Sequence, residues 1–494
     1  RCRQSPDRRV FAPMDGVLED TICAIATPAG EGGIGIIRIS GPGTLSVAEK
    51  IVRLRSGLLL RTVSSHTLHL ADILPPELPS QCDPPATQLM RPDRDVIDEA
   101  LVVLMKGPRS FTAEDVVEIH CHAGHVVLRL VCEACLTAGA RLAEPGEFTK
   151  RAFLNGRLDL SQAEAVLDTI RAKSEAGLKI AQRHLRGDLG RRVEQLRTRF
   201  VKLLAQVEAG IDFAEEDIAF VGREELRSTL EETGHEIRTM LETSQRGVRL
   251  REGARVVISG RPNVGKSSLL NTLLGADRAI VTNIPGTTRD VIEESVVWDG
   301  LMITLVDTAG LRDTADIVEQ EGIKRTHSAM EQGDLVLHVL DATELNEQDL
   351  SRTCSLPACH MSLVVINKSD LVDTDRITQL SRLAEEGTGC KVLVTSVQTG
   401  VGIDELRESI RAYLLPASLE STGSMMITNV RHRQALERAE TSIQEALASV
   451  RNGVEPEFVA IDLRGASDAL GEVTGAITSD EVLNQIFSEF CIGK

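Results

Sequence analysis

The spacing of hydrophobic and polar residues divides the chain into regions of different structure. Up to about residue 145, short apolar runs alternate with glycine and proline turns, which predicts strands at 22–27, 34–40, 99–106 and 116–121. A helix is expected at 126–136, and the proline-rich residues 71–95 are expected to form a loop. The pattern therefore predicts an α+β domain over residues 17–145.

Helical spacing then replaces the strand pattern. Apolar residues recur every three or four positions around Ala163 and Phe200, with little strand signal before residue 250. Ser161 and Glu164 are spaced as a capping box at one expected helix start. A basic run between Arg183 and Lys202 has two interpretations, a solvated helix face or a contact with RNA phosphates.

Strands alternate with helices between residues 251 and 416, which is the doubly wound α/β pattern. After the polar linker 417–424, amphipathic helices are expected at 434–450, 456–470 and 479–490. We therefore expect one all-α domain made of residues 146–250 plus 417–494, with the α/β domain 251–416 inserted into it.

Composition narrows the class of protein. The chain has 494 residues, of which 42% are hydrophobic and 26% charged, as in globular proteins with several domains. No apolar run approaches the roughly 18 residues of a membrane span. The net charge of −18 excludes a generally basic surface but not a local basic patch. The ten cysteines have no regular spacing, which favours a reducing compartment over a disulfide framework.

Residues 1–16 are expected to be a leader outside the folded domains. Residues 1–9 contain four arginines and one acid, which fits the remnant of an organellar transit peptide. A disordered leader, with Met14 near the true start, fits equally well. The expected location is the cytoplasm for a bacterial protein, and the mitochondrial matrix or plastid for a eukaryotic one.

Histidines and cysteines in the first domain have the residue types of a zinc site. However, His120 and His122 share one face of the predicted strand, whereas Cys121 points to the other. Cys132 and Cys135 fall within a predicted helix, where cysteine commonly packs as a small apolar residue. Packing is therefore the preferred interpretation.

The strand at Val256–Ile258 leads directly into the motif G-x-x-x-x-G-K-S at Gly260–Ser267. Glycines let backbone N–H groups close on phosphate oxygens, and the helix that follows directs its positive end towards them. In such a motif, Lys266 reaches the outer phosphates and Ser267 binds Mg²⁺. This stretch predicts a nucleotide-binding site.

Further motifs follow in the order found in GTPases. They are Gly286-Thr287-Thr288-Arg289-Asp290, Asp307-Thr308-Ala309-Gly310, Asn367-Lys368-Ser369-Asp370 and Ser396-Val397-Gln398. A threonine of the first completes the Mg²⁺ shell, Asp307 contacts the ion indirectly, and the Gly310 N–H senses the γ-phosphate. The Asp370 carboxylate can accept two hydrogen bonds from guanine, which selects GTP over ATP, and the last motif covers the base.

Leu311 stands where Ras-like enzymes carry the glutamine that orients the attacking water. Because an apolar side chain cannot do this, another group must position the water, and Asp313, Asp316 and Glu319 are the nearby acids. No arginine finger is identifiable, so a cation bound by Asn263 could supply the missing charge.

The chain resembles the MnmE (TrmE) family of tRNA-modification GTPases from about Thr21 to its end. The most specific segments are Gly32–Gly41, Pro145–Thr149, Arg151–Gly156 and the terminal Phe490-Cys491-Ile492-Gly493-Lys494. Composition alone would make that last segment a frayed tail. The resemblance implies a tetrahydrofolate-binding and dimerisation domain, a helical domain and an inserted Ras-like G domain.

The resemblance also implies an activity. A K⁺-dependent GTPase, a homodimer, would join an FAD-dependent partner of the MnmG/GidA type in a heterotetramer-like complex. Together they would place a 5-(carboxymethyl)aminomethyl-type group on the wobble uridine of certain tRNAs. The one-carbon unit would come from 5,10-methylene-tetrahydrofolate, with 5-formyl-tetrahydrofolate as a related ligand, and FAD would sit on the partner.

The G-domain residues that the resemblance implies form several groups. The GTP site would contain Asn263, Val264, Gly265, Lys266, Ser267, Ser268, Thr282, Thr287, Thr288, Asp307, Thr308, Ala309, Gly310, Asn367, Lys368, Asp370, Ser396, Val397 and Gln398. Mg²⁺ would be bound by Ser267 and Thr288, and K⁺ by Asn263, Thr282, Ile284 and Thr287. Glu319 would orient the catalytic water, with Lys266 and Thr288 as further catalytic residues.

The folate contacts implied by the resemblance are Arg38, Glu118, Arg157 and Lys494. Some members carry lysine at the position of Arg157, which keeps the charge but changes the geometry. Cys491 stands where a reactive thiol has been considered, and an ordinary buried cysteine is the alternative.

A different class of function stays open. Several GTP-dependent switches in ribosome assembly or RNA binding share the Gly-x-Pro-Asn-x-Gly-Lys-Ser-Ser signature, but they would be expected to carry a C-terminal RNA-binding module. The folate-type first domain and the Cys-Ile-Gly-Lys end argue against this alternative. A folate-binding scaffold with a vestigial G domain conflicts with the complete set of nucleotide motifs.

Overall fold

The computed structural model describes residues 20–28, 30–76, 95–212, 222–275, 292–298, 300–307, 330, 332–345, 361–414 and 426–494. Within them the chain forms two compact units. One comprises the described residues up to 167 together with 184–199 and 467–494, and the other comprises 168–183 and the described residues from 200 to 466. The expected leader and the linker 417–424 lie outside the described residues, and the domain boundaries stay a prediction.

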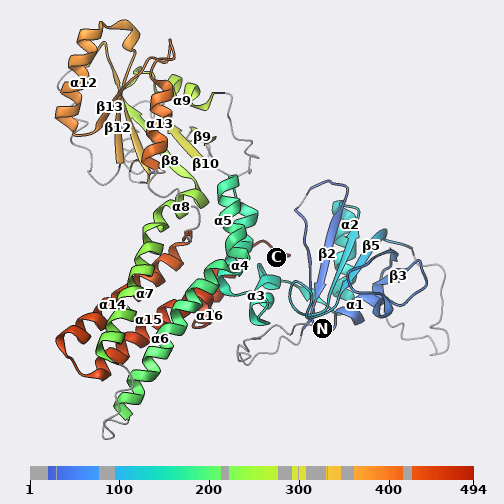
Figure 1. Ribbon diagram of the computed structural model, residues 1–494. Helices are drawn as coiled ribbons and strands as arrows, with labels where there is room; N and C mark the ends of the chain where they lie inside the picture. The colour runs from blue at the N-terminus through green and yellow to red at the C-terminus, as the bar shows by residue number, and fades with distance from the viewer. Residues whose placement is uncertain are drawn as a thin grey trace, which may run out of the picture. The chain divides into compact units, whose positions relative to one another are not determined.

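The first unit contains a sheet whose described strands run in the order β3-β4-β5-β6-β2-β1-β7. Helices α1 and α2 share one hydrophobic core with Ile37, Val102 and Ile119 on one face of the sheet (Figure 1). Because side chains alternate along a strand, Arg38 and Glu118 lie on the opposite face. The elements are β1 Ile22–Ile25, β2 Gly35–Ser40, α1 Thr44–Ile51, β3 Val52–Leu54, the short helix η1 Leu60–Thr62, β4 Leu68–Ile73, β5 Asp98–Met105, β6 Val116–Cys121, α2 His125–Ala138 and β7 Arg141–Leu142.

Four predicted strands and the helix of this domain are confirmed, with small shifts at their ends. Sequence analysis missed α1, β3, β4 and β7, and the loop predicted from residue 71 is wrong at its start because β4 continues to Ile73. In β4 the polar His69 and Asp72 interrupt the apolar run, so pairing with β5, rather than local pattern, defines this strand.

The cysteines of α2 pack in the core. Cys132 and Cys135 lie with Cys23 in the hydrophobic cluster beneath the sheet, which confirms the packing interpretation. His122 Nδ1 lies 2.8 Å from Asp98 Oδ1. Within the described part of the chain, no three or more His, Cys, Asp or Glu side chains are arranged to hold a metal ion.

The helical region contains long helices on both sides of the α/β domain in sequence. Helices α7 and α14 lie side by side (Figure 1), and Arg223 Nε of α7 donates to the Val450 carbonyl of α14 at 2.8 Å. The chain therefore returns to the same place after the α/β domain, which is inserted. The elements are α3 Glu147–Leu154, α4 Leu160–Arg171, α5 Glu175–Leu185, α6 Asp188–Asp212, α7 Arg223–Glu242, α8 Ser244–Glu252, α14 Val430–Asn452, α15 Pro456–Thr474 and α16 Asp480–Ser488.

Two details of these helices bear on the predictions. In the basic run, Arg191 pairs with Asp188 and Arg197 with Glu194, so part of its charge is neutralised. The choice between a solvated face and an RNA contact stays open. None of the helices in the described ranges is both long and apolar enough to span a membrane.

The capping box predicted at the start of α4 is wrong in its residues. Asp159 Oδ1 accepts from the Gln162 N–H at 2.9 Å, and Gln162 Oε1 accepts from the Asp159 N–H at 3.0 Å. Ser161 lies inside the helix and donates to Asp159 Oδ1 at 2.6 Å. Because α4 begins at Leu160, Asp159 is the capping residue and Gln162 is its partner three positions later.

The inserted domain has the Ras-like fold. Its described strands run in the order β13-β12-β11-β8-β10-β9, and only the β9–β10 pair among them is antiparallel. Helices α9 and α13 pack on one face and α12 on the other (Figure 1). The elements are β8 Ala254–Gly260, α9 Lys266–Leu274, β9 Ile292–Trp298, β10 Leu301–Asp307, β11 Leu335–Asp341, β12 Met361–Asn367, the short helix η4 Ser369–Leu371, α12 Thr374–Thr388, β13 Lys391–Val394 and α13 Ile403–Leu414.

Candidate functional site

Parallel strands bring the predicted nucleotide motifs to one edge of this sheet. Gly260 ends β8, Asp307 ends β10 and Asn367 ends β12. Ligands of open α/β sheets bind outside the carboxyl ends of the strands. We call this set of strand ends, with the loops that follow them, the nucleotide edge.

The phosphate loop has a backbone that depends on glycine. Asn263 and Gly265 have φ angles of 66° and 96°, in the left-handed region. A Cβ atom on Gly265 would lie 2.5 Å from Asn367 Nδ2, so a larger residue would displace one of the two motifs. The turn places the first N–H groups of α9 at the end of β8, as a phosphate site requires.

The predicted Mg²⁺ ligand and its neighbour are in contact. Ser267 Oγ donates to Asp307 Oδ2 at 2.7 Å, which joins the start of α9 to the end of β10. A hydroxyl and a carboxylate are the oxygen ligands that Mg²⁺ prefers, so these residues fit that ion. Lys266 is buried, and its Nζ donates to the Arg261 carbonyl across the loop at 2.7 Å.

The guanine motif is tied to the phosphate loop through Asn367. Its Nδ2 donates to the Val264 carbonyl at 3.0 Å, and its Oδ1 accepts from the Val397 N–H at 3.3 Å. Asn367 is buried, so its amide acts as a connector between three loops and does not itself face a base. The predicted phosphate loop and the predicted base loop are therefore linked through one side chain.

Lys368 makes a second connection and reveals a residue that sequence analysis missed. Its Nζ donates to the Asn263 carbonyl at 2.9 Å and lies 2.5 Å from Asp341 Oδ2. Burial raises the pKa of Asp341, but hydrogen bonds from Lys368 and Thr343 outweigh it, so the net pKa is lowered. The available signal was its place at the end of an apolar strand, like that of Asp307.

The residues predicted to hold the base also converge. Ser396 Oγ donates to Asp370 Oδ1 at 2.5 Å, and the Thr399 N–H donates to Ser396 Oγ at 3.2 Å. Asp370 and Gln398 are exposed. The Asp370 carboxylate is thus oriented by the loop that is expected to cover the base.

Several predicted residues cannot be placed. Thr282, Ile284, Thr287, Thr288, Thr308, Ala309, Gly310 and Glu319 lie outside the described residues. Their roles towards Mg²⁺, K⁺ and the attacking water stay predictions. Asn263 is described, and its side chain is exposed.

A second set of predicted residues meets on the open face of the first sheet. Arg38 Nε and Nη2 both lie 2.8 Å from Glu118 Oε1 on the adjacent strand β6. Arg38 Nη1 donates to the Gly493 carbonyl at 3.1 Å, although 455 residues separate the two in sequence. Phe111 and Phe148 place their rings 5.6 Å from the Arg38 guanidinium carbon. We call these five residues the Arg38 site.

The C-terminal segment is docked, contrary to the frayed tail that composition indicates. Gly493 has a φ of 93°, and a Cβ atom there would lie 2.5 Å from the Ile25 carbonyl. The Lys494 N–H donates to the Cys491 carbonyl at 3.3 Å. Cys491 is exposed, so the interpretation of it as a buried cysteine is wrong, whereas its reactivity stays a prediction.

Arg157 contacts the backbone next to Phe111 of the Arg38 site. Its Nε donates to the Ser110 carbonyl at 2.9 Å, and Ser110 precedes Phe111 in the chain. The structure thus brings together Arg38, Glu118 and the chain end, and places Arg157 against the segment that carries Phe111.

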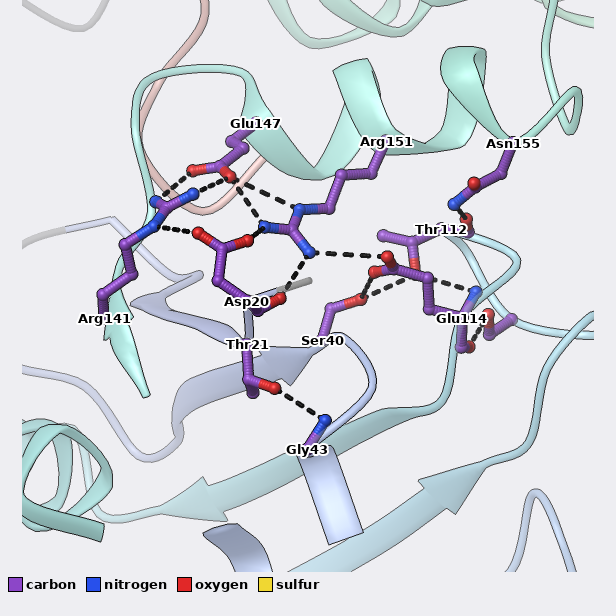
Figure 2. A network of polar contacts seen from close by, with 11 residues as sticks. Asp20, Thr21, Ser40, Gly43, Thr112, Glu114, Arg141, Glu147, Arg151 and Asn155 are labelled. Carbon is purple, nitrogen blue, oxygen red and sulfur yellow. Dashed lines mark hydrogen bonds and ion pairs between the residues drawn. The ribbon is translucent and has the colours of Figure 1, made fainter. Parts of the chain in front are cut away.

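A buried ion network borders the Arg38 site and was not predicted. Arg151 is fully buried and contacts Asp20, Glu147 and Glu114 (Figure 2). Burial raises the pKa of Glu147, but hydrogen bonds from Arg141, from the Glu144 N–H and from Arg151 leave its net pKa below the ordinary value. The local signal was the spacing of Glu147 and Arg151, four apart on one helix.

Two protein-family models match the chain. The model described as the MnmE helical domain matches residues 160–491, and the model described as the GTP-binding protein TrmE N-terminus matches residues 21–157. Between them they cover the nucleotide edge and the residues of the Arg38 site except Gly493, which follows the second matched range.

Curated relatives match nearly the whole chain. The tRNA modification GTPase MnmE of Heliobacterium modesticaldum is 47% identical over 484 residues, which are 97% of this chain and 100% of the relative. The protein of the same name from Bacillus subtilis is 43% identical over 480 residues, 96% of this chain and 100% of the relative.

Solved structures match a smaller part of this chain. The G domain of the T. maritima FeoB iron transporter is 30% identical and covers 32% of this chain and 98% of that one, with a TM-score of 0.25. Era in complex with MgGDPNP and a segment of 16S ribosomal RNA is 27% identical and covers 38% of this chain and 66% of that one, with a TM-score of 0.28.

Proposed function

Because the chain belongs to the MnmE (TrmE) family of tRNA modification GTPases, we propose that it is the K⁺-dependent GTPase of a wobble-uridine modification complex. It is a GTP hydrolase that acts in tRNA modification. With an FAD-dependent partner of the MnmG/GidA type, it would form a 5-(carboxymethyl)aminomethyl-type group from a tetrahydrofolate one-carbon unit. The observation that carries the proposal is one chain holding both the nucleotide edge and the Arg38 site.

We propose roles for several residues of the nucleotide edge. Lys266 would contact the outer phosphates, Ser267 would bind Mg²⁺ beside Asp307, and Asp370 would select guanine. Mg²⁺ neutralises charge on the transferring phosphoryl group when it is bound. Asn263, with Thr282, Ile284 and Thr287, would hold K⁺ as a positive charge in place of an arginine finger.

The experiment for the GTPase half of the proposal compares GTP turnover in KCl and NaCl. We expect turnover to rise sharply in KCl and to collapse in Glu319→Ala, while binding of GTP survives. Asp313→Ala and Asp316→Ala are matched controls, because they remove neighbouring acids that are not assigned to the water. Equal turnover in the two salts would overturn the K⁺ assignment, and a collapse in a control variant would overturn the role of Glu319.

The Arg38 site supports the folate half of the proposal. Arginine and lysine pair with carboxylates such as those of folate, and a carboxylate such as Glu118 accepts hydrogen bonds from a pterin ring. Arg38, Arg157 and Lys494 would supply the cations, with 5,10-methylene-tetrahydrofolate as donor of the one-carbon unit. Cys491, which is exposed and whose carbonyl accepts from the Lys494 N–H, is a candidate thiol of the site.

Calorimetric titration with 5-formyl-tetrahydrofolate tests this half. Glu118→Gln keeps the shape but removes the charge, so we expect weaker binding. Glu133→Gln on the helical side of the sheet, where Glu133 pairs with Arg129, is the matched control. Equal affinity in Glu118→Gln and in the unaltered protein would contradict the folate assignment.

An apolar sheet face supports the proposal of a homodimer. Leu68, Leu70 and Leu101 are exposed, and Leu70 and Leu101 face each other across β4 and β5. Exposed apolar patches of this kind are typical of association surfaces. Sedimentation of Leu70→Glu should show monomer where the unaltered protein is a dimer, and an unchanged mass would contradict this interface.

Analysis of tRNA nucleosides decides between the proposed function and its alternative. Cells that lack the protein should lose the wobble modification, and the gene should restore it. Unchanged nucleosides together with a ribosome-assembly defect would favour the GTP-dependent assembly switch. Fractionation of the source cell would test the proposed compartment, the cytoplasm or an organelle.

A further inference from the structure

Arg151 lies where three parts of the first unit meet. Its Nη2 lies 2.7 Å from Asp20 Oδ1 and 2.9 Å from Glu147 Oε1, and its Nη1 lies 3.4 Å from Glu114 Oε1 (Figure 2). The guanidinium is fully buried, and a buried charge is stable only beside such partners, so these three carboxylates keep it in place. Arg151 therefore holds the segment before β1, helix α3 and the segment before β6 in one geometry.

Both aromatic rings of the Arg38 site are carried by parts that Arg151 joins. Phe148 belongs to α3 and follows Glu147 directly, while Phe111 lies three residues before Glu114. Each ring centre is 5.6 Å from the guanidinium carbon of Arg38, within the range of a cation–π contact. A shift of α3 relative to the 110–114 segment would move the rings apart.

The 110–114 segment is also tied to the strand that carries Arg38. Ser40, two residues beyond Arg38 on β2, places its Oγ 2.7 Å from Thr112 Oγ1 and donates to Glu114 Oε2 at 2.7 Å. Asn155, just after α3, donates from Nδ2 to the Thr112 carbonyl at 2.8 Å (Figure 2). A continuous path of contacts therefore leads from Arg151 through Glu114 and Ser40 to the strand that carries Arg38.

We propose that Arg151 is a positioning residue for Arg38. By fixing α3 against the 110–114 segment, it holds Phe148 and Phe111 against the Arg38 guanidinium and presets its orientation for the ligand. This inference rests on the proposed folate site and adds a residue that lies outside that site. Preset geometry strengthens binding because less conformational freedom is lost when the ligand arrives.

The test is a double-mutant cycle on the full chain, with 5-formyl-tetrahydrofolate as the probe in calorimetric titration. Arg151→Lys and Arg38→Lys should each weaken binding about tenfold, the lower end for residues that orient a binding group. If Arg151 acts through Arg38, the double variant should bind no more weakly than Arg38→Lys alone. A purely structural role predicts losses that multiply, and that result, or unchanged affinity in Arg151→Lys, would overturn the inference.

Arg141→Lys is the matched control. Arg141 contacts Asp20 and Glu147 as Arg151 does, but its partners do not include Glu114 and its side chain is 42% exposed. Its replacement should leave the affinity unchanged, and an equal loss there would overturn the inference by showing a general effect of the network. If the unaltered protein does not bind the probe, the folate proposal itself fails.

Asn155→Ala gives a second test should Arg151→Lys fail to fold. Asn155 is exposed, so its truncation removes one hydrogen bond to the 110–114 segment and little packing. Binding should weaken about threefold, the effect of one hydrogen bond, and should not weaken further when combined with Arg38→Lys. No change in the single variant would overturn the continuity of the path.

Discussion

The nucleotide edge and the Arg38 site are assembled in different ways. The nucleotide edge takes its residues from the ends of successive parallel strands, and connections such as Asn367 to Val264 and Ser267 to Asp307 run between neighbouring loops. The Arg38 site takes its residues from the middle of two antiparallel strands, from the segment before β6, from α3 and from the last turn of the chain. Its bond from Arg38 to Gly493 joins residues 455 positions apart.

The geometry of the two sites therefore depends on different parts of the structure. At the nucleotide edge the backbone would supply the proposed anion site, so glycines and strand ends determine its shape. At the Arg38 site side chains supply the contacts, so a buried network must hold them. The first should be sensitive to backbone substitutions and the second to changes far from the ligand.

The largest effect is expected from Gly265→Ala. The added Cβ would meet Asn367 Nδ2 at 2.5 Å at a φ of 96°. We expect GTP binding to weaken about 100-fold, from overpacking of roughly 3 kcal/mol, in titrations with a fluorescent GTP analogue. Gly389→Ala, with a φ of 67° and no atom within 4 Å, is the control and should bind normally. Equal binding by both variants would contradict a backbone-determined site.

The second largest effect is expected on the pH dependence of stability, through Glu147 of the buried ion network. The pKa of Glu147 is lowered below its ordinary 4.5, because hydrogen bonds from Arg141, Glu144 and Arg151 outweigh burial. Its stabilising contribution is therefore fully present above pH 4.5 and is lost as the pH falls through the folded-state pKa. Glu147→Gln should lower the free energy of unfolding by about 2 kcal/mol at neutral pH.

Urea unfolding between about pH 6 and about pH 3 measures this dependence. The acid-induced loss of stability should be smaller in Glu147→Gln than in the unaltered protein. The exposed Glu144→Gln should keep the full loss. A Glu147→Gln profile parallel to that of the unaltered protein would exclude Glu147 as a source of the acid sensitivity.

A smaller effect is expected at the chain end. In Gly493→Ala the new Cβ would meet the Ile25 carbonyl at 2.5 Å, which should loosen the terminal segment from Arg38. We expect folate affinity to fall about tenfold, roughly 1.4 kcal/mol, with little change in overall stability. Gly156→Ala, at a φ of 68° with open space around it, is the matched control. Unchanged affinity in Gly493→Ala would remove the terminal segment from the site.

The smallest effect belongs to the start of α4. Asp159→Ala removes the helix cap and should cost about 1 kcal/mol of stability. Ser161→Ala removes one hydrogen bond to that cap and should cost about 0.5 kcal/mol. Denaturant unfolding of the two variants measures the difference. A larger loss in Ser161→Ala would restore Ser161 as the capping residue.

The nucleotide edge was largely predictable because its motifs are contiguous. Gly260–Ser267 and Asn367–Asp370 follow apolar strands, and parallel pairing brings such strand ends together whatever the rest of the fold. Asp341 escaped prediction because a single acid at a strand end is common. Lys368 was predicted from its motif, but its ion pair with Asp341 depends on β11 and β12 lying side by side.

The Arg38 site was predictable only through family resemblance. Alternation along β2 and β6 places Arg38 and Glu118 on the open faces of their strands, but the pairing of 38 with 118 depends on register. The spacing of Glu147 and Arg151 indicated an ion pair but not its burial, because arginine is normally exposed and the burial of Arg151 is explained by its three partners.

By itself, then, the sequence determined the order of the α+β, all-α and α/β domains and the position of the phosphate loop. Both can be recognised in short stretches of sequence, because hydrophobic periodicity and glycine spacing are local features. It also determined that the chain carries every motif of a GTPase. Only the tertiary structure decided which side chains surround Arg38, that the last residues dock on β1 and β2, and that Arg151 joins three distant parts. The physical reason is that buried charge is stable only beside its partners, and those partners are chosen by packing between segments far apart in the chain.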